Sequence, residues 1–578
     1  MKRKFVQIAA LCLAAVLLLT TGGGTASASS AGSDSRIIRV GLHYGTGAME
    51  GLNLENKTGS GFRFGYYDGS NQFVELGSTS EKAVSVVKTM NVYYGTYDGY
   101  TSYHSALKSS SVAVGEYHLQ LPGTYSTYEE AQSAVADYTG GFPAYIDGKF
   151  YARVGSYTTK SQAEEALSAM GTGCKVGETS GYGVSVVITG TNTIVFQFDD
   201  LGKGTGLGVE PNRLGAGDYT TLSKNVLYPG GFRFERIGGG FSSMTVVNMV
   251  EFGEYIEGVV ATEMSNSWPV EALKAQAVAA RSYAVTLGSK HSAHHFDICD
   301  STDCQAYTGQ SRAGSNTRAA VEGTAGQMCL YNGKVAQTFY YSSNGGASES
   351  VSNVWGSNQA NYPYLVGKAD PYESTLNLNN TWERTVTSDQ IISRLLFGSN
   401  VTAPIVSAEV TSYTEAGNPK LITFTDSAGK RFPVSSATIY SYNKGFGLPS
   451  FRFGFAGPDQ SAAASSSDSV SVNGSATVNG TSGLYAIDGN GNISALGSDV
   501  YIITSSGTSQ LGQGGGQSAG NDWSSSVTAV NGSITFAGRG WGHNIGMSQW
   551  GAYAMAQQNY TYTQILQFYY TGITVGFM

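Results

Sequence analysis

The clearest helical pattern in the chain covers residues 254–264. Apolar side chains stand at positions 255, 256, 259, 260 and 264, which is the spacing of one helix face. Glu263 follows Val259 by four residues and therefore projects from this apolar face, whereas Glu257 points elsewhere. Burial penalises an ionised carboxylate and raises its pKa. The pattern makes Glu263 a candidate general acid, and a glutamate paired with a core arginine is the structural alternative.

A second helix is predicted directly after the first. Pro269 suits the first position of a helix, and Gly288 suits its end. The alanines between them would let another helix approach closely. Lys274 and Arg281 are seven residues apart and share one face, while Gln276 points to a different side.

The N-terminal half alternates short strand-like stretches with turns. Residues 36–105 show strands and no recognisable chemistry. Residues 112–178 contain a duplication, because Gly123–Thr127 and Gly155–Thr159 each follow a strand-like stretch and open an alanine-containing helix. Ser or Thr is available as the N-cap in both copies. This repeat predicts a small βαββαβ sandwich.

The remaining chain divides by composition. Residues 182–456 form a large mixed segment, and residues 457–525 shift to Ser, Gly and Ala. The latter predict a flexible insertion with one hairpin around 489–491. Residues 526–578 return to dense aromatics and are expected to complete the domain that 182–456 begins. The expected fold class is multidomain α+β, with a larger domain that is β-rich.

Composition agrees with this architecture. A length of 578 residues favours several domains, and 41% hydrophobic residues permit packed cores. Charged residues make up only 13%, while Gly and Tyr are abundant, which favours strands with uncharged polar surfaces. Tyrosine suits carbohydrate, although ordinary strand tyrosines explain many of the 37. The net charge of −8 and the absence of a basic stripe exclude nucleic acid as an expected partner.

The first residues predict export. Basic residues at 2–4 precede an apolar run from Ile8 to Leu19 and a small-residue site ending at Ala28. This is the pattern of a secretory signal over residues 1–28. The run is short for a membrane span, so an uncleaved anchor is the lesser alternative. We expect the protein to lie outside the cytoplasm.

A histidine- and cysteine-rich segment covers residues 291–304. Clustered histidines beside two cysteines five apart could hold a structural zinc ion. An oxidising exterior instead favours a disulfide between the cysteines. Any zinc here would be structural, and we expect no cofactor to be required for catalysis. The candidate ligands are His294, His295, Cys299 and Cys304, with Asp300 or Asp303 as an optional fourth oxygen ligand.

The duplicated segment resembles a known domain. The run Tyr151–Tyr157 and the alanine-rich helix after it are similar to a SPOR domain, over residues 112–178. This resemblance implies binding to peptidoglycan glycan strands that have lost their peptides, and hence association with the cell wall. A generic ferredoxin-like fold without a ligand is the alternative.

Four motifs resemble the SpoIID/LytB family in their order along the chain. They are the pair of predicted helices, which counts as one motif, and the segments Tyr340–Gly346, Pro363–Leu365 and Gly538–Ala552. The sequence departs from the family pattern at Asn544, where glycine is more usual, and in its long Ser/Gly insertion.

The resemblance implies lytic cleavage of peptide-free glycan, with Glu263 as the catalytic acid. It implies sporulation as a possible setting. The LytB branch is instead described as an amidase enhancer, so a non-catalytic glycan-binding protein that stimulates a cell-wall amidase is the alternative. A purely structural surface protein is a third alternative.

For His543 a structural hydrogen bond is favoured over substrate contact. The residues assigned to substrate binding are Lys274, Gln276, Arg281, Tyr341, Tyr364, His543 and Gln549.

One carboxylate suffices for the implied reaction. Ordinary glycosidases need two, one for the leaving group and one for water or covalent attack. In a lytic transglycosylase the 6-hydroxyl of the sugar itself attacks the anomeric carbon, so one glutamate can serve both steps. Gln276, Arg281 and Tyr341 would then position the sugar.

Overall fold

The computed structural model describes residues 34–107, 111–177, 179–212, 219–222, 226–288, 290–376, 378, 380–456 and 523–578, and six short strands between 469 and 510. The predicted signal sequence at 1–28 lies outside the described residues. Most of the insertion at 457–525 does as well. Its described strands pair as three hairpins, where the sequence predicts one: β29 (Ser469–Val472) with β30 (Ala476–Asn479), β31 (Tyr485–Ile487) with β32 (Ile493–Ala495), and β33 (Tyr501–Thr504) with β34 (Gly507–Gln510). No helix in the described part of the chain combines the length and apolar character needed to cross a membrane.

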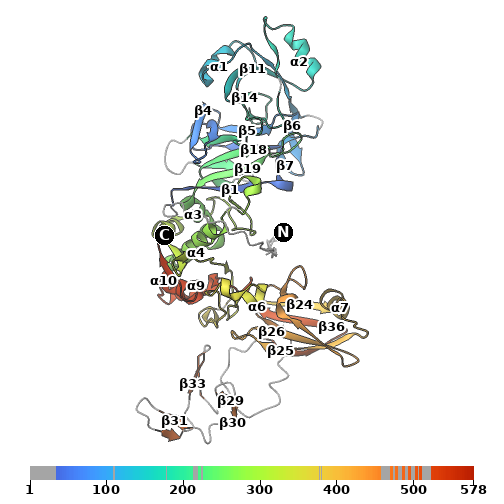
Figure 1. Cartoon of the computed structure of the whole chain (residues 1–578), viewed down its shortest axis with the longest axis vertical. Helices are drawn as coiled ribbons and strands as arrows, with labels where there is room; N and C mark the ends of the chain where they lie inside the picture. Colours follow the sequence, from blue (N-terminus) through green and yellow to red (C-terminus); the bar gives the residue numbers. More distant parts are fainter. Residues whose placement is uncertain are drawn as a thin grey trace, which may run out of the picture.

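Two large sheets pack face to face in the N-terminal half (Figure 1). The rings of Phe64 and Phe196, one from each sheet, stack with centroids 5.5 Å apart. The first sheet has the order β20 (Ile298–Cys299), β1 (Ile37–His43), β19 (Thr245–Glu251), β18 (Gly231–Glu235), β15 (Leu207–Pro211), β3 (Phe62–Tyr67) and β4 (Phe73–Thr79). The second has the order β12 (Lys175–Gly177), β9 (Tyr117–Gln120), β11 (Lys149–Tyr157), β10 (Gly141–Ile146), β14 (Ile194–Asp199), β13 (Val184–Ile188), β5 (Ala83–Lys88), β2 (Gly51–Glu55), β16 (Thr220–Leu222) and β17 (Val226–Tyr228).

The pairing of these strands crosses the domain boundaries that were expected from the sequence. β1 pairs with β19, and β5 pairs with β13, so strands from 36–105 share sheets with strands that follow residue 182. The reason is physical: an unpaired strand edge must find a partner, and here the partners come from distant segments. The first strands are therefore part of the same sandwich as the strands that lead into the predicted first helix.

The predicted βαββαβ succession is present as β9, α1 (Tyr128–Ala134), β10, β11, α2 (Lys160–Leu167) and β12. Thr127 and Thr159 accept hydrogen bonds from the backbone two to three residues into each helix, which confirms the expected N-caps. β10 also pairs in parallel with β14. This unit is therefore continuous with the sandwich rather than closed on itself.

Helices form a layer beyond the sandwich (Figure 1). α4 runs through this layer and ends before Gly288, whose φ is +58°. Its alanines are buried and α3, α5, α9 and α10 pack around it, as their small side chains allow. The helices are α3 (Phe252–Glu263), α4 (Val270–Leu287), α5 (Ser315–Glu322), α9 (Gln549–Gln557) and α10 (Tyr562–Tyr569).

Two further sheets lie on the other side of this layer (Figure 1). Strands from residues 526–578 enter both of them, β36 in the first and β35 in the second. The sheets are β24 (Thr381–Thr387), β36 (Ser533–Arg539) and β28 (Phe453–Phe455), and β27 (Arg431–Ser435), β26 (Pro419–Asp426), β25 (Ile405–Tyr413) and β35 (Ser526–Thr528). The helices α6 (Val351–Trp355), α7 (Ser388–Leu395) and α8 (Ser436–Tyr440) flank them.

Small sheets complete the described elements. They are β7 (Tyr100–His104), β6 (Val92–Tyr97) and β8 (Val112–Val114); β22 (Lys334–Val335), β21 (Met328–Tyr331) and β38 (Thr574–Gly576); and β23 (Tyr340–Tyr341) with β37 (Met547–Ser548). The whole is a mixed, β-rich α+β protein, in agreement with the expected class.

Candidate functional site

Glu263 is the last residue of α3, where the helix meets the start of α9. Its side chain is partly accessible, and Gln549 donates a hydrogen bond from Nε2 to its Oε2 at 2.9 Å. Burial raises the pKa of Glu263 to about 6, while the hydrogen bond from Gln549 acts in the opposite direction. A carboxyl with this pKa can both give and take a proton close to neutral pH.

Gln549 reaches Glu263 through a short parallel pairing. β23 and β37 align Tyr340 with Met547 and Tyr341 with Ser548. Ser548 then caps α9, because its Oγ accepts from Gly551 N at 3.1 Å. Gln549 is the first residue of that helix. Two segments separated by some 200 residues of chain thus meet beside the carboxylate.

Tyr340 lies close to Glu263, and the sequence did not identify it as a candidate site residue. Its hydroxyl accepts from Gln305 Nε2 at 3.0 Å, and Gln305 Oε1 accepts from the Tyr255 hydroxyl at 3.0 Å. Burial first, and the charge of Glu263 second, raise the pKa of Tyr340 well above its ordinary value. The hydroxyl therefore stays protonated. The sequence signal that could have identified Tyr340 is its place beside Tyr341 in the motif Tyr340–Gly346.

Glu373 is a second acidic residue that the sequence did not single out. It is buried, and burial followed by the charge of Asp370 raises its pKa. Its oxygens accept from Ser343 Oγ at 2.5 Å, Ser548 Oγ at 2.6 Å, Asn344 N at 2.8 Å and Gly345 N at 2.8 Å. Because these donors come from both paired segments, Glu373 links the segments to each other.

His543 packs in an aromatic group beside this pairing. Its ring lies 5.1 Å from Tyr341 and 5.1 Å from Trp355, measured between centroids. The backbone N–H of Ile545 donates to His543 Nδ1 at 3.1 Å, so the structural hydrogen bond favoured from the sequence is present. Burial lowers the pKa of His543 to about 4, which keeps the ring neutral.

Asn544 explains the departure from the family pattern. Its φ is +62°, a left-handed conformation that glycine and asparagine adopt most readily. Its Nδ2 donates to the carbonyls of Asn344 and Ala347 at 2.9 and 3.0 Å, and its Oδ1 accepts from Phe451 N at 3.0 Å. Asparagine therefore satisfies the same backbone geometry and adds three contacts.

Arg281 does not lie in the site, contrary to the sequence-based assignment. Its guanidinium is buried and binds Asp34 in a two-pronged ion pair, with Nε–Oδ1 at 3.0 Å and Nη2–Oδ2 at 2.9 Å. It also donates to the carbonyl of Gln327 at 3.2 Å. A buried guanidinium requires a countercharge, and the N-terminal segment supplies it.

Lys274 and Tyr364 are also engaged elsewhere. Lys274 Nζ forms an ion pair with Glu271 at 2.7 Å, one turn earlier on α4. The Tyr364 hydroxyl accepts from Gln337 N at 2.8 Å. The structure gives both side chains structural contacts and does not bring either to Glu263.

Gln276 and Tyr341 remain candidates. Gln276 is fully buried, and neither its amide oxygen nor its nitrogen has a hydrogen-bond partner among the described residues. Such a group calls for water or a ligand. Tyr341 is buried next to His543, and burial, then Glu373, raises its pKa, so it can act only as a neutral hydroxyl.

The cysteine-containing segment forms a compact cluster. The ligand atoms of His291, Cys299, Asp303 and Cys304 all lie within 4.8 Å of one another. Cys299 and Cys304 are free thiols, so the disulfide favoured from the sequence is absent from the structure. The thiol of Cys304 donates to Cys299, which lowers the pKa of Cys299 and raises that of Cys304. Two sulfurs, one imidazole and one carboxylate fit tetrahedral zinc.

The histidines of this cluster correct the expected ligands. His291, rather than His294 or His295, contacts the thiols, with Nε2 at 3.3 Å from Cys304 Sγ. The chain makes a 3-10 turn at Ser292–His294, and His295 has a left-handed backbone conformation. This turn directs the side chains of His294 and His295 away from the thiols. His294 lies against Tyr44, and His295 Nδ1 bonds Glu235 Oε1 at 2.7 Å.

Comparison with known proteins finds similarity to the SpoIID family over part of the chain. Residues 241–331, which include α3, α4 and the cysteine cluster, match the family model described as stage II sporulation protein. The chain is 32% identical over 322 residues to the amidase enhancer of Bacillus subtilis (strain 168), covering 55% of this chain and 40% of that protein. It is 28% identical over 334 residues to an uncharacterised protein of Brachyspira hyodysenteriae, covering 58% and 68%. It is 25% identical over 349 residues to the stage II sporulation protein D of Bacillus amyloliquefaciens, covering 57% and 75%. The chain thus spans two fifths of the length of the first relative.

Proposed function

We propose that this chain is an exported lytic transglycosylase that cleaves peptide-free glycan strands of peptidoglycan, with Glu263 as its acid and base. The observation that carries the proposal is a desolvated carboxyl with a pKa of about 6, hydrogen-bonded to the neutral amide of Gln549. The nearby buried carboxylate Glu373 is occupied by backbone and hydroxyl donors. This arrangement supports a one-carboxylate reaction over a two-carboxylate hydrolysis.

The reaction follows from the two protonation states of Glu263. The protonated carboxyl gives its proton to the glycosidic oxygen while the bond from that oxygen to the anomeric carbon breaks. The carboxylate then takes the proton of the sugar 6-hydroxyl as that oxygen bonds to the same carbon. The product is an anhydro sugar, no water is consumed, and Glu263 ends as it began. Gln549 holds the carboxyl in place during both steps.

The module at residues 112–178 is proposed to bind the same polymer. Its βαββαβ succession and the run Tyr151–Tyr157 support a SPOR-like role. Export by the predicted signal would place the protein at the wall, where both modules meet their substrate. Sporulation is the proposed setting, because one relative is named stage II sporulation protein D.

A second candidate function is a non-catalytic enhancer of a cell-wall amidase. The observation that favours it is the 32% identity to the protein named amidase enhancer. In that case the region around Glu263 would bind glycan without cutting it, and the amidase would be the partner.

A structural zinc ion is proposed at the cysteine cluster. His291, Cys299 and Cys304 would hold it, with Asp303 as the fourth ligand. The ion would cross-link the loop that follows α4 and would take no part in glycan cleavage. Metal analysis of the purified protein by mass spectrometry should find about one zinc per chain. Cys304→Ser should lose that zinc and melt at a lower temperature, and a zinc-free protein of unchanged stability would contradict the proposal.

The decisive test uses amidase-stripped glycan strands with the mature protein and Glu263→Gln. Products are analysed by mass spectrometry. Glu251→Gln, an exposed carboxylate at the other end of α3, is the matched control. Shortened strands ending in 1,6-anhydro-muramic acid, lost only in Glu263→Gln, would support the transglycosylase. Reducing ends would contradict it in favour of hydrolysis. Binding without cleavage would favour the enhancer.

A further inference from the structure

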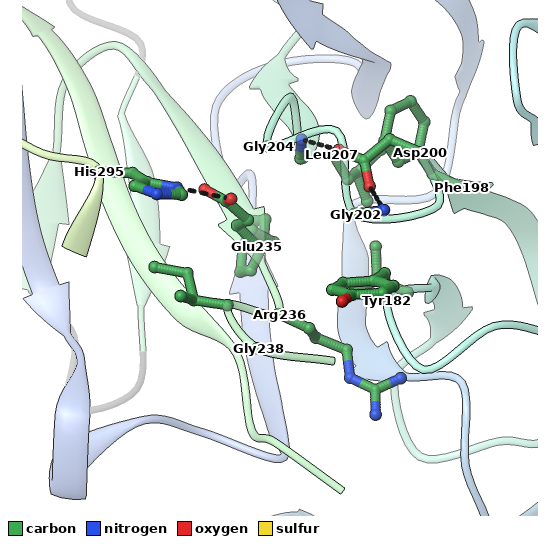
Figure 2. A pocket seen from close by; sticks show the side chains of 14 residues that line it. Tyr182, Phe198, Asp200, Gly202, Gly204, Leu207, Glu235, Arg236, Gly238 and His295 are labelled. Carbon is green, nitrogen blue, oxygen red and sulfur yellow. Dashed lines mark hydrogen bonds and ion pairs between the residues drawn. The ribbon is translucent and has the colours of Figure 1, made fainter. Parts of the chain in front are cut away.

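The sandwich contains a pocket separate from the residues around Glu263. It has a volume of about 150 Å³ and lies where β13 and β14 of one sheet approach β15 and β18 of the other. Its apolar wall comes from Val184, Phe198, Leu207 and Phe234. Polar side chains close the remaining sides (Figure 2). A cavity of this size accommodates a six-membered ring or a smaller group, and it is too small for a glycan strand.

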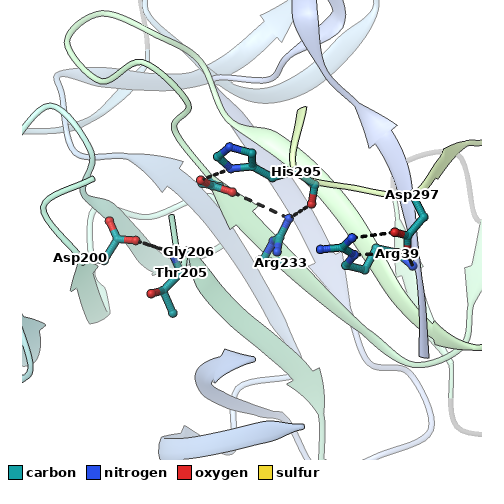
Figure 3. Close-up of polar contacts among 8 residues, drawn as sticks. Arg39, Asp200, Thr205, Gly206, Arg233, His295 and Asp297 are labelled. Atoms are coloured by element: carbon teal, nitrogen blue, oxygen red, sulfur yellow. Dashed lines mark hydrogen bonds and ion pairs between the residues drawn. The ribbon is translucent and has the colours of Figure 1, made fainter. Parts of the chain in front are cut away.

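One wall carries a buried carboxylate with unused capacity. Glu235 is 7% exposed, and its Oε1 accepts from His295 Nδ1 at 2.7 Å. Its Oε2 has no hydrogen-bond partner among the described residues. Arg233 lies 3.8 Å from Oε2 and donates instead to the carbonyl of His295 (Figure 3). A buried carboxylate oxygen without a donor is rare and indicates a missing hydrogen-bond donor.

The charge around Glu235 limits the ligand. The carboxylate already has a guanidinium and an imidazole beside it, so a second cation would be repelled. An anion would meet the carboxylate itself. A neutral group with an N–H or O–H donor is therefore the best complement to this wall.

The opposite wall is formed by Tyr182 (Figure 2). A Cβ added at Gly202 or at Gly239 would come within 2.7 Å of its ring, so the backbones of both glycines pack against the ring. Asp200 fixes the loop that carries Gly202. It accepts hydrogen bonds from the backbone N–H of Gly202 (Figure 2) and from those of Thr205 and Gly206 (Figure 3). In Figure 2 the Tyr182 hydroxyl points toward the side of the pocket that carries Glu235.

We propose that this pocket binds the acetamido group of an N-acetylated amino sugar. The amide N–H would donate to Glu235 Oε2, the Tyr182 hydroxyl would donate to the amide carbonyl, and the methyl group would rest on the apolar wall. Since cell-wall glycan consists of such sugars, the pocket would be an accessory site that holds the polymer at a distance from the cutting residue. This inference rests on the proposed function for its choice of polymer.

The test is saturation-transfer NMR with N-acetylglucosamine on the full mature chain carrying Glu263→Gln, which blocks cleavage. The acetamido methyl protons should receive the strongest saturation, and glucose and glucosamine should bind at least severalfold more weakly. Tyr182→Phe keeps the ring between the two glycines and removes the hydroxyl. It should weaken binding about fivefold, the value of one neutral hydrogen bond. Glu235→Gln should weaken binding similarly. Tyr413→Phe, an exposed tyrosine on β25, is the matched control.

Equal binding of N-acetylglucosamine to Tyr182→Phe and to the control would overturn the inference, because the sugar would then bind elsewhere. Equal binding of glucose would overturn the choice of the acetamido group. Absence of saturation at millimolar sugar would overturn both. The cleavage assay separates this inference from the proposed function. A chain that cuts glycan while its pocket ignores N-acetylglucosamine loses only the pocket site. A chain that binds the sugar here without cutting glycan loses only the transglycosylase.

Discussion

Replacing Glu263 by glutamine should stabilise the native protein at neutral pH. The pKa of Glu263 is about 6, against an ordinary value of 4.5, because the carboxyl is desolvated. That difference corresponds to about 2 kcal/mol, at about 1.36 kcal/mol per pKa unit. Because the native state holds the proton more tightly than the unfolded chain does, the stabilisation is fully present below about pH 4.5. It is lost as the pH rises through about 6.

Glutamine does not ionise, so Glu263→Gln escapes this loss. We expect the variant to be about 2 kcal/mol more stable than the natural protein at about pH 7.5, and equally stable near pH 4. Hydrogen exchange of peptides from α3 and α9, measured by mass spectrometry, reports the local opening free energy in this large protein. Glu251→Gln should match the natural protein at both pH values. Weaker protection of Glu263→Gln at both pH values would refute desolvation as the cause of the raised pKa.

Three further substitutions test the structure around the site. Gln549→Leu removes the hydrogen bond from Gln549 that lowers the pKa of Glu263. That pKa should therefore rise by about 1, which carbon-13 NMR of the carboxyl can measure. An unchanged titration would mean that Gln549 does not hold the carboxylate. Asp34→Ala leaves the buried guanidinium of Arg281 without its countercharge and should cost about 3 kcal/mol in urea unfolding, whereas a loss below 1 kcal/mol would contradict the pairing. Asn544→Ala should destabilise the protein by about 1 kcal/mol more than Asn544→Gly does, because alanine disfavours a positive φ. A higher melting temperature for Asn544→Ala than for Asn544→Gly would contradict this backbone argument.

Local features of this protein could be read from its sequence. The apolar spacing over 254–264 corresponds to α3. Gly288 marks the end of α4, as predicted. The threonines that open the duplicated helices are their N-caps. These features depend on contacts within a few residues, so their pattern is present in any short window of the chain.

Some sequence-based assignments failed because side chains were judged on one helix alone. Glu257 was expected to point away from the apolar face that carries Glu263, and the pattern did not show that this other side is buried against Arg318 of α5, at 3.3 Å. Arg281 was assigned to substrate, yet Asp34 neutralises it inside the protein. In both cases the deciding partner comes from a distant segment that the local pattern does not reveal.

The sequence by itself determined the candidate acid, the helices that present it and the family-like motifs. Only the tertiary structure decided what surrounds that acid. Gln549 contacts Glu263 across 286 residues of sequence, through the pairing of β23 with β37 that Glu373 secures. The turn at Ser292–His294 likewise decides that His291 meets the thiols. Helical periodicity is a short-range property, whereas these contacts require whole sheets and helices to be packed first, and their geometry is set by that packing.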